Sequence, residues 1–119
     1  LELTQPDWVI GMGQCSRGKK IRIERRAINF RQEKKTEMAH CIDPKGSTYV
    51  YVNFKIKPDS DSCLSYNAGQ YVCNFSMYTF LQEVKKRPFK YAFLHIPNDF
   101  EIEKAVHYLI NLKERIFNL

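Results

Sequence analysis

Residues 64–74 read LSYNAGQYVCN and place a cysteine where a predicted strand gives way to a predicted helix. The strand covers residues 63–66, a turn-prone segment follows at residues 67–69, and apolar residues at helical spacing continue over residues 69–86. Cys73 therefore falls in the first turn of that helix. Free backbone N–H groups in a first turn favour negative charge, which promotes the thiolate form of a cysteine. A nucleophilic cysteine and a buried structural cysteine both fit this position.

Length and composition indicate one soluble globular domain. The chain has 119 residues, of which 44% are hydrophobic and 27% are charged, and this suits a single modest core. No stretch is long and apolar enough to span a membrane, and residues 1–5 lack the basic region and apolar core of a signal peptide. We expect a cytoplasmic protein without membrane partners. Since the chain has no initiator Met, we expect it to begin inside a longer parent.

The net charge of +6 raises the question of a nucleic-acid partner. The basic residues fall in short, scattered blocks at residues 17–20, 25–26, 34–35 and 85–87, and no nucleic-acid-binding motif accompanies them. We therefore expect a solvated basic face rather than a nucleic-acid interface.

The cysteine spacing indicates neither a metal site nor a disulfide framework. Cys15, Cys41, Cys63 and Cys73 form no C-x-x-C pair, so zinc is not expected. Nothing marks the chain as secreted, and we expect reduced thiols.

The remaining chain reads as alternating strands and helices. Strands are predicted at 8–13, 21–25, 49–54, 63–66 and 91–96, helices at 69–86 and 101–117, and a polar surface loop at 31–47. The order strand–helix–strand–helix in the second half predicts an α/β fold with a largely parallel sheet. In such sheets, functional residues gather near the carboxyl ends of strands, where Glu24, Cys73 and His95 fall.

The predicted helix at 101–117 carries an apolar stripe that indicates core packing. The stripe consists of Ile102, Val106, Leu109, Ile110 and Ile116.

A cysteine hydrolase needs a nucleophile, a base and a group that orients the base. His95 is a candidate base, although a histidine at a strand end is commonly structural. His40 in the polar loop and His107 beside the apolar stripe are weaker candidates. Glu24 lies on a strand-like segment, where a carboxylate is ordinarily a solvated charge.

Taken together, three segments resemble the pyroglutamyl peptidase I family. Residues 65–74 resemble its cysteine motif, and residues 93–97, FLHIP, resemble its histidine motif. Gly13-Gln14, together with residues 21–29, resembles its glutamate motif. The order Glu, Cys, His is also that of the family. The similarity covers nearly the whole chain, as the C-terminal part of the family's domain.

The resemblance implies a three-layer α/β/α sandwich around a largely parallel twisted sheet, and an activity that removes N-terminal pyroglutamate from peptides without a cofactor. In that reading residues 1–119 form one partial domain, truncated at its N-terminus. Cys73 would be the nucleophile, His95 the base and Glu24 the group that orients the base. The family often forms homo-oligomers, so the resemblance also allows a homo-oligomer.

The pocket implied by the resemblance has further contributors. Gln14 matches a position beside the bound pyroglutamate ring, and Tyr71 and Val72 are expected to wall the pocket. The backbone N–H of Cys73 is a natural oxyanion donor.

The chain also departs from the family pattern. The Gly-Phe-x-Pro-Phe loop that covers the pyroglutamate ring is not in this sequence, and the family's Asp-x-Arg-Ile-Pro segment is replaced by residues 30–35. A helix expected before the cysteine motif is missing between Lys57 and Ser62, and Arg22 replaces a Ser or Thr. The alternative reading is therefore a non-catalytic or weakly active relative that serves as an interaction module.

Overall fold

The fold is built on a four-stranded mixed sheet, in a computed structural model that describes residues 5–118. The strands are β1 (Trp8–Cys15), β2 (Ile21–Glu24), β7 (Ser62–Ser65) and β8 (Lys90–Pro97). Their order in the sheet is β1-β8-β2-β7. The outer pairs β1–β8 and β2–β7 are parallel, whereas the central pair β8–β2 is antiparallel. The prediction of a largely parallel sheet is confirmed.

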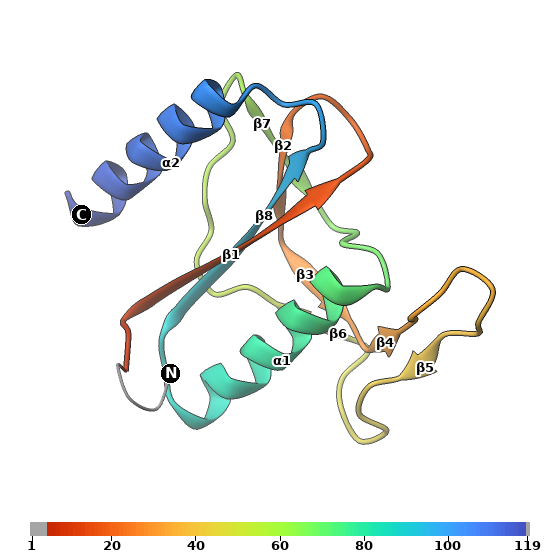
Figure 1. The fold of residues 1–119 in the computed structure, drawn as a ribbon. Helices are drawn as coiled ribbons and strands as arrows, with labels where there is room; N and C mark the ends of the chain where they lie inside the picture. The colour runs from red at the N-terminus through yellow and green to blue at the C-terminus, as the bar shows by residue number, and fades with distance from the viewer. Residues whose placement is uncertain (1–4, 119) are drawn as a thin grey trace.

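Two small two-stranded antiparallel sheets extend from one end of the main sheet (Figure 1). The first pairs β3 (Arg26–Ile28) with β6 (Tyr49–Tyr51), and the second pairs β4 (Phe30–Arg31) with β5 (His40–Cys41). The predicted strand at 49–54 thus ends at Tyr51, and the polar segment at 31–47 contains a short hairpin. The described chain has no helix between β6 and β7, where the family comparison predicted a deletion.

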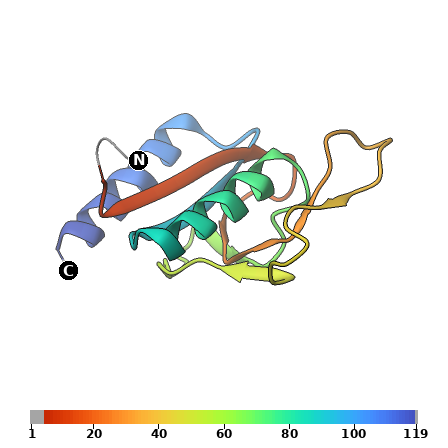
Figure 2. The ribbon, with the colours of Figure 1, turned by 90° about the horizontal axis from the view of Figure 1, so that it is seen from below.

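The helices α1 (Val72–Lys86) and α2 (Ile102–Phe117) lie on opposite sides of the sheet, which gives the three-layer α/β/α arrangement (Figures 1 and 2). α1 begins at Val72 rather than at Gly69, because Gly69 adopts a φ of +82° in the preceding turn. Within residues 5–118, neither helix is long and apolar enough to cross a membrane.

The alternation of side chains along β8 divides the core into two clusters. Tyr91 and Phe93 are buried on the α1 side, whereas Ala92 and Leu94 are buried on the α2 side. β2 follows the same rule, since Ile21 and Ile23 pack on the α2 side. Arg22 and Glu24 therefore point to the α1 side, the side on which His95 lies.

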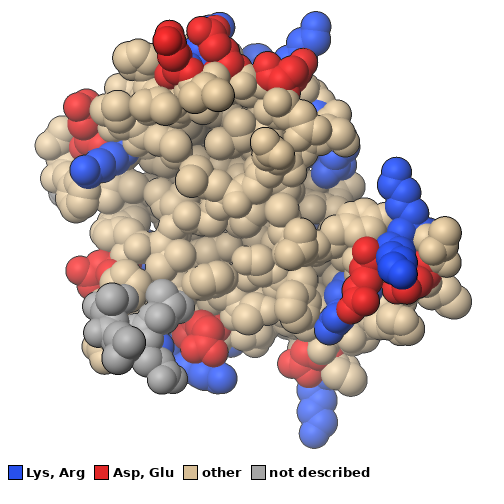
Figure 3. All heavy atoms as spheres, in the orientation of Figure 1, with Lys and Arg blue, Asp and Glu red and all other residues tan. Residues whose placement is uncertain are grey.

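The predicted core packing of the α2 stripe is confirmed for Leu109 and Ile116, which pack against the cluster on the α2 side, and is wrong for the other three residues. Tyr108 and Leu112 are buried, but Ile102 is 79% exposed and Ile110 is 48% exposed. The sheet beneath α2 covers only one side of the helix, and the described residues place nothing over the other. In Figure 3, charged side chains of both signs lie around the margin of the face shown, and its centre carries few.

Candidate active site

Glu24 and His95 form a buried hydrogen-bonded pair. The Nδ1 atom of His95 lies 2.6 Å from Oε2 of Glu24, and the exposed fractions of the residues are 4% and 0%. Because a carboxylate can only accept, the imidazole donates from Nδ1, and this leaves Nε2 to accept a proton. Phe93 contacts the imidazole edge to face, with ring centroids 5.1 Å apart. The ring is therefore fixed in both tautomer and orientation.

The pairing arises across antiparallel strands, which differs from the predicted arrangement. We expected both residues at the carboxyl edge of parallel strands, but β2 runs opposite to β8, so that Glu24 pairs in register with Phe93 and Arg22 with His95. Glu24 reaches His95 diagonally on the α1 side of the sheet.

Arg22 also faces the Glu24 carboxylate. Its Nε lies 3.6 Å from Oε2, and its Nη2 donates to Oγ of Ser65 at 2.7 Å. Oε1 of Glu24 has no hydrogen-bond partner among the described residues. Oε2 is thus shared between imidazole and guanidinium. Sequence reasoning recorded Arg22 only as a departure from the family and missed this contact, because it depends on the register of β2 against β8.

Cys73 follows Val72, the residue that begins α1, as the sequence predicted. The N-cap residue Tyr71 makes no side-chain capping bond, and the first turn carries no acidic residue. The first backbone bond of the helix runs from the Phe75 N–H to the carbonyl of Tyr71 at 3.0 Å. The N–H groups before Phe75 therefore have no carbonyl to bind within the helix, and they are available to an anion.

One cavity of about 600 Å³ brings the predicted residues together. It is lined by Gln14, Tyr71, Val72, Cys73 and His95, while Glu24 lies behind the imidazole. The walls are open, since Val72 is 76% exposed and Gln14 is also exposed. The cavity can thus admit a ligand, but these side chains cover little of it.

Gly13 allows Cys73 and His95 to approach the same point. A Cβ atom at Gly13 would lie 2.5 Å from Sγ of Cys73 and 3.6 Å from Cδ2 of His95. The sulfur therefore occupies the space that a side chain would need. Sequence reasoning noted Gly13 as part of a motif and missed this role.

The pKa of the Cys73 thiol runs against the expectation from its helix position. Partial burial raises this pKa, and the nearby negative charges of Glu24 and then Cys15 raise it further. The thiol therefore keeps its proton at neutral pH unless a base removes it. His95, whose Nε2 is left to accept, is the base that the cavity offers.

Asn74 anchors the start of α1 to β3, a contact that sequence reasoning also missed. Its side chain accepts from the Ile28 N–H at 2.8 Å and donates to the carbonyls of Ile28 and Phe30, each at 2.9 Å. Arg17 donates to the carbonyl of Asn67 at 2.9 Å and holds the loop before α1 from the other side. The available signal in the sequence was an asparagine directly after the candidate nucleophile, and the structure buries this residue fully.

Comparisons with known proteins point to one family. The family model described as pyroglutamyl peptidase matches residues 1–106. Pyrrolidone-carboxylate peptidase 1 of Saccharolobus solfataricus is 30% identical over 108 residues, which cover 79% of this chain and 51% of that protein. The pyrrolidone-carboxylate peptidase of Enterococcus faecalis is 28% identical and is covered over 53% of its length.

Solved structures agree. The pyrrolidone carboxyl peptidase of the hyperthermophile Pyrococcus furiosus matches with a TM-score of 0.70 and 28% identity, over 81% of this chain and 54% of that chain. The chain therefore spans about half the length of the relatives that it matches.

Proposed function

The chain belongs to the pyroglutamyl peptidase family, and from this premise we propose that it is a cysteine peptidase that removes N-terminal pyroglutamate from peptides. We also propose that residues 1–119 form a single, partial domain of that family. The observation that carries the proposal is the shared cavity, in which Cys73 and His95 border one point while Glu24 holds the imidazole.

In the proposed first step, His95 Nε2 accepts the thiol proton of Cys73, and the sulfur attacks the carbonyl that joins pyroglutamate to the next residue. The carbonyl oxygen becomes an oxyanion, for which the free Cys73 N–H at the start of α1 is the proposed donor. When the C–N bond breaks, His95 returns the proton to the leaving amine, and a thioester remains on Cys73.

In the second step, His95 takes a proton from water, and the resulting hydroxide attacks the thioester. The proton passes to the Cys73 sulfur as pyroglutamic acid leaves. Glu24 keeps Nδ1 protonated throughout and stabilises the imidazolium that forms in each step.

Substrate binding is proposed for the residues around the cavity opening. Gln14, Tyr71 and Val72 would contact the lactam ring. Because these side chains are largely exposed, they bury little of a ring, and we expect weak binding. No cofactor enters this chemistry. A cytoplasmic location, the absence of nucleic-acid and membrane partners, and self-association stay predictions.

The proposal is tested with a fluorogenic pyroglutamyl amide. We expect slow cleavage, which Cys73→Ser and His95→Ala each reduce by about 10³-fold or more. Cys63→Ser, which changes a partly buried cysteine on β7, is the matched control and should retain the activity. A folded wild-type chain that cleaves nothing would favour the non-catalytic alternative.

A pyroglutamyl aldehyde provides a readout that does not need turnover. Its carbonyl carbon would bond to Sγ of Cys73 while the thiol proton moves to the oxygen, so the mass of the protein rises by that of the aldehyde. Addition at Cys73 that is lost in Cys73→Ser supports the proposed nucleophile, whereas addition that persists in this variant contradicts it.

A further inference from the structure

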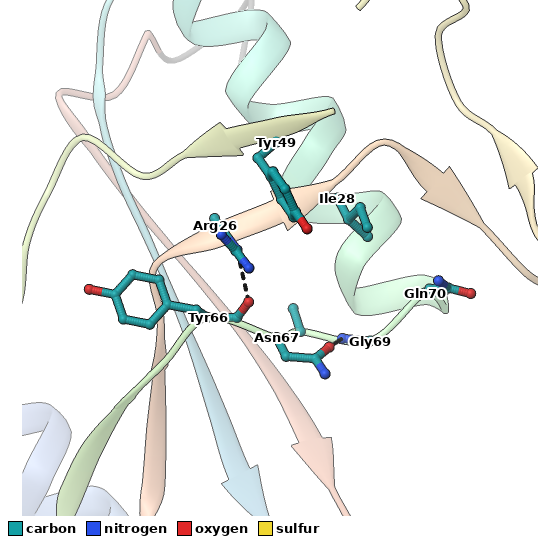
Figure 4. A pocket seen from close by; sticks show the side chains of 8 residues that line it. Arg26, Ile28, Tyr49, Tyr66, Asn67, Gly69 and Gln70 are labelled. Atoms are coloured by element: carbon teal, nitrogen blue, oxygen red, sulfur yellow. Dashed lines mark hydrogen bonds between the residues drawn. The ribbon is translucent and has the colours of Figure 1, made fainter. Parts of the chain in front are cut away.

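A second cavity of about 220 Å³ is shown in Figure 4, and it shares part of its lining with the candidate active site. Residues 67–70 line both cavities, so the loop before α1 forms a wall between them. Across the second cavity lie Arg26 and Ile28 of β3 and Tyr49 of β6. Gln70, in the shared wall, directly precedes Tyr71 and Val72 at the edge of the first cavity. The two cavities are thus adjacent but have different linings.

Arg26 gives the second cavity a fixed positive charge. Its guanidinium carbon lies 3.8 Å from the centre of the Tyr49 ring and 5.8 Å from that of Tyr66. Its Nε donates to the carbonyl of Tyr66 at 2.9 Å, and Nη1 donates to the hydroxyl of Tyr51 at 3.3 Å. The side chain is therefore held by a ring and two hydrogen bonds rather than lying free in solvent.

This charge has no carboxylate partner within residues 5–118. Arg31, by comparison, pairs with Glu33 at 2.6 Å, and Arg22 faces Glu24. A guanidinium also has more N–H donors than the two contacts of Arg26 use. A partly buried, oriented guanidinium with spare donors is suited to bind a carboxylate in a forked geometry.

We propose that the second cavity binds the free carboxylate of the residue that follows pyroglutamate, with Arg26 as the residue that recognises it. This inference rests on the proposed function, because the carboxylate belongs to the leaving part of the substrate. Ile28, Ala68 and the Tyr49 ring provide apolar surface for the side chain of that residue. The preferred substrates are then pyroglutamyl dipeptides with a free C-terminus.

The test measures binding in the full chain carrying Cys73→Ser, which removes the nucleophile and so prevents turnover. Pyroglutamyl-leucine and pyroglutamyl-leucinamide are titrated while the backbone amide resonances of Gly69, Gln70 and residue 73 are followed by NMR. We expect the acid to bind about tenfold more tightly than the amide, as for a charge-assisted contact. Arg26→Gln should remove this difference, so that the acid binds no more tightly than the amide.

Arg31→Gln is the matched control, because it removes an equal charge that also lies over an aromatic ring, that of Phe75, but outside the cavity. It should retain the preference for the acid. Arg26→Lys retains the charge but loses the forked geometry, and it should retain only part of the preference. Arg26→Lys therefore still tests the carboxylate site if Arg26→Gln fails to fold.

N-acetyl-leucine and its amide separate this inference from the proposed function. If acetyl-leucine shifts Gly69 and Gln70 in an Arg26-dependent manner while the pyroglutamyl compounds leave residue 73 unshifted, the carboxylate site stands and the pyroglutamyl site fails. If the acid and amide bind equally, or if Arg26→Gln retains the preference, the carboxylate site is overturned, even where the pyroglutamyl amide is cleaved.

Discussion

The face of the sheet beneath α1 and the face beneath α2 use their buried positions differently. On the α1 side, Glu24 and His95 are buried as a hydrogen-bonded pair. One carboxylate oxygen of Glu24 has no hydrogen-bond partner among the described residues. On the α2 side, the buried positions of β2 and β8 are apolar, as at Ile23 and Leu94. Because side chains alternate along a strand, β2 and β8 supply the candidate site on one face and hydrophobic packing on the other.

The comparison predicts its largest effect on stability at the α2 side. Leu112→Ala removes a side chain that is 2% exposed, and it should lower the free energy of unfolding by about 2–5 kcal/mol. Ile110→Ala on the same helix removes a side chain that is 48% exposed and should cost no more than about 0.5 kcal/mol. Urea unfolding at low protein concentration measures both. A comparable loss at Ile110 would mean that another molecule covers that side of α2.

On the α1 side, the next effect is expected at Gly13. Gly13→Ala places a Cβ atom 2.5 Å from Sγ of Cys73, and the resulting displacement should cost about 1–3 kcal/mol of stability. In a Cys73→Ala background the sulfur is gone, so the same substitution should cost much less. Additive costs in this double-mutant cycle would contradict the close approach of Gly13 and Cys73.

A smaller effect is expected at Tyr91, whose buried hydroxyl has no partner among the described residues. Tyr91→Phe removes this hydroxyl and should raise stability by about 1 kcal/mol at neutral pH. Tyr78→Phe is the matched control, because Tyr78 is equally buried but donates to the carbonyl of Ser47 at 3.4 Å, and it should not stabilise the protein. A loss of stability in Tyr91→Phe, measured by urea unfolding, would show that the hydroxyl is satisfied.

The same tyrosine contributes to a loss of stability in alkali. Burial raises the pKa of Tyr91, Tyr78 and Tyr108, and also that of the Cys73 thiol. A group whose pKa is higher in the folded state stabilises the fold below its unfolded pKa, and this contribution is lost as the pH rises through the folded pKa. Stability should therefore fall above about pH 9–10, where free thiols and phenols ionise. Tyr91→Phe should lose less stability over that range than the wild-type chain.

The elements predicted well were those whose signal is local. β1 and β8 are apolar runs ended by polar or proline-containing segments, and α1 and α2 have apolar residues at helical spacing. The two small sheets were harder to predict, because they depend on side chains distant in the sequence. β3 is held by Asn74, and the chain around β5 is held by Asn29, which accepts from the N–H groups of Ile42 and Asp43.

The candidate site residues could be named from the sequence, but their arrangement could not. Motif resemblance identified Glu24, Cys73 and His95, yet it did not reveal that β2 runs antiparallel to β8 or that Arg22 shares the Glu24 carboxylate. The pKa of Cys73 depends on burial and on charges brought together by folding, so helix position alone predicted its direction wrongly. The exposure of one side of α2 could not be predicted from the sequence either, because the apolar residues of the helix have the same spacing whether or not the sheet extends beneath them.

The central claim is that Cys73, His95 and Glu24 act as one unit, and the most direct test is mass-mapped labelling with limiting iodoacetamide. At neutral pH we predict that Cys73 is alkylated faster than Cys15, Cys63 and even the exposed Cys41, because His95 removes its proton. His95→Ala should then slow Cys73 by about 10²-fold or more and leave the other cysteines unchanged. The contrary result is a Cys73 that reacts more slowly than Cys41 in both proteins, as its raised pKa alone would dictate; it would show that the imidazole does not activate the thiol.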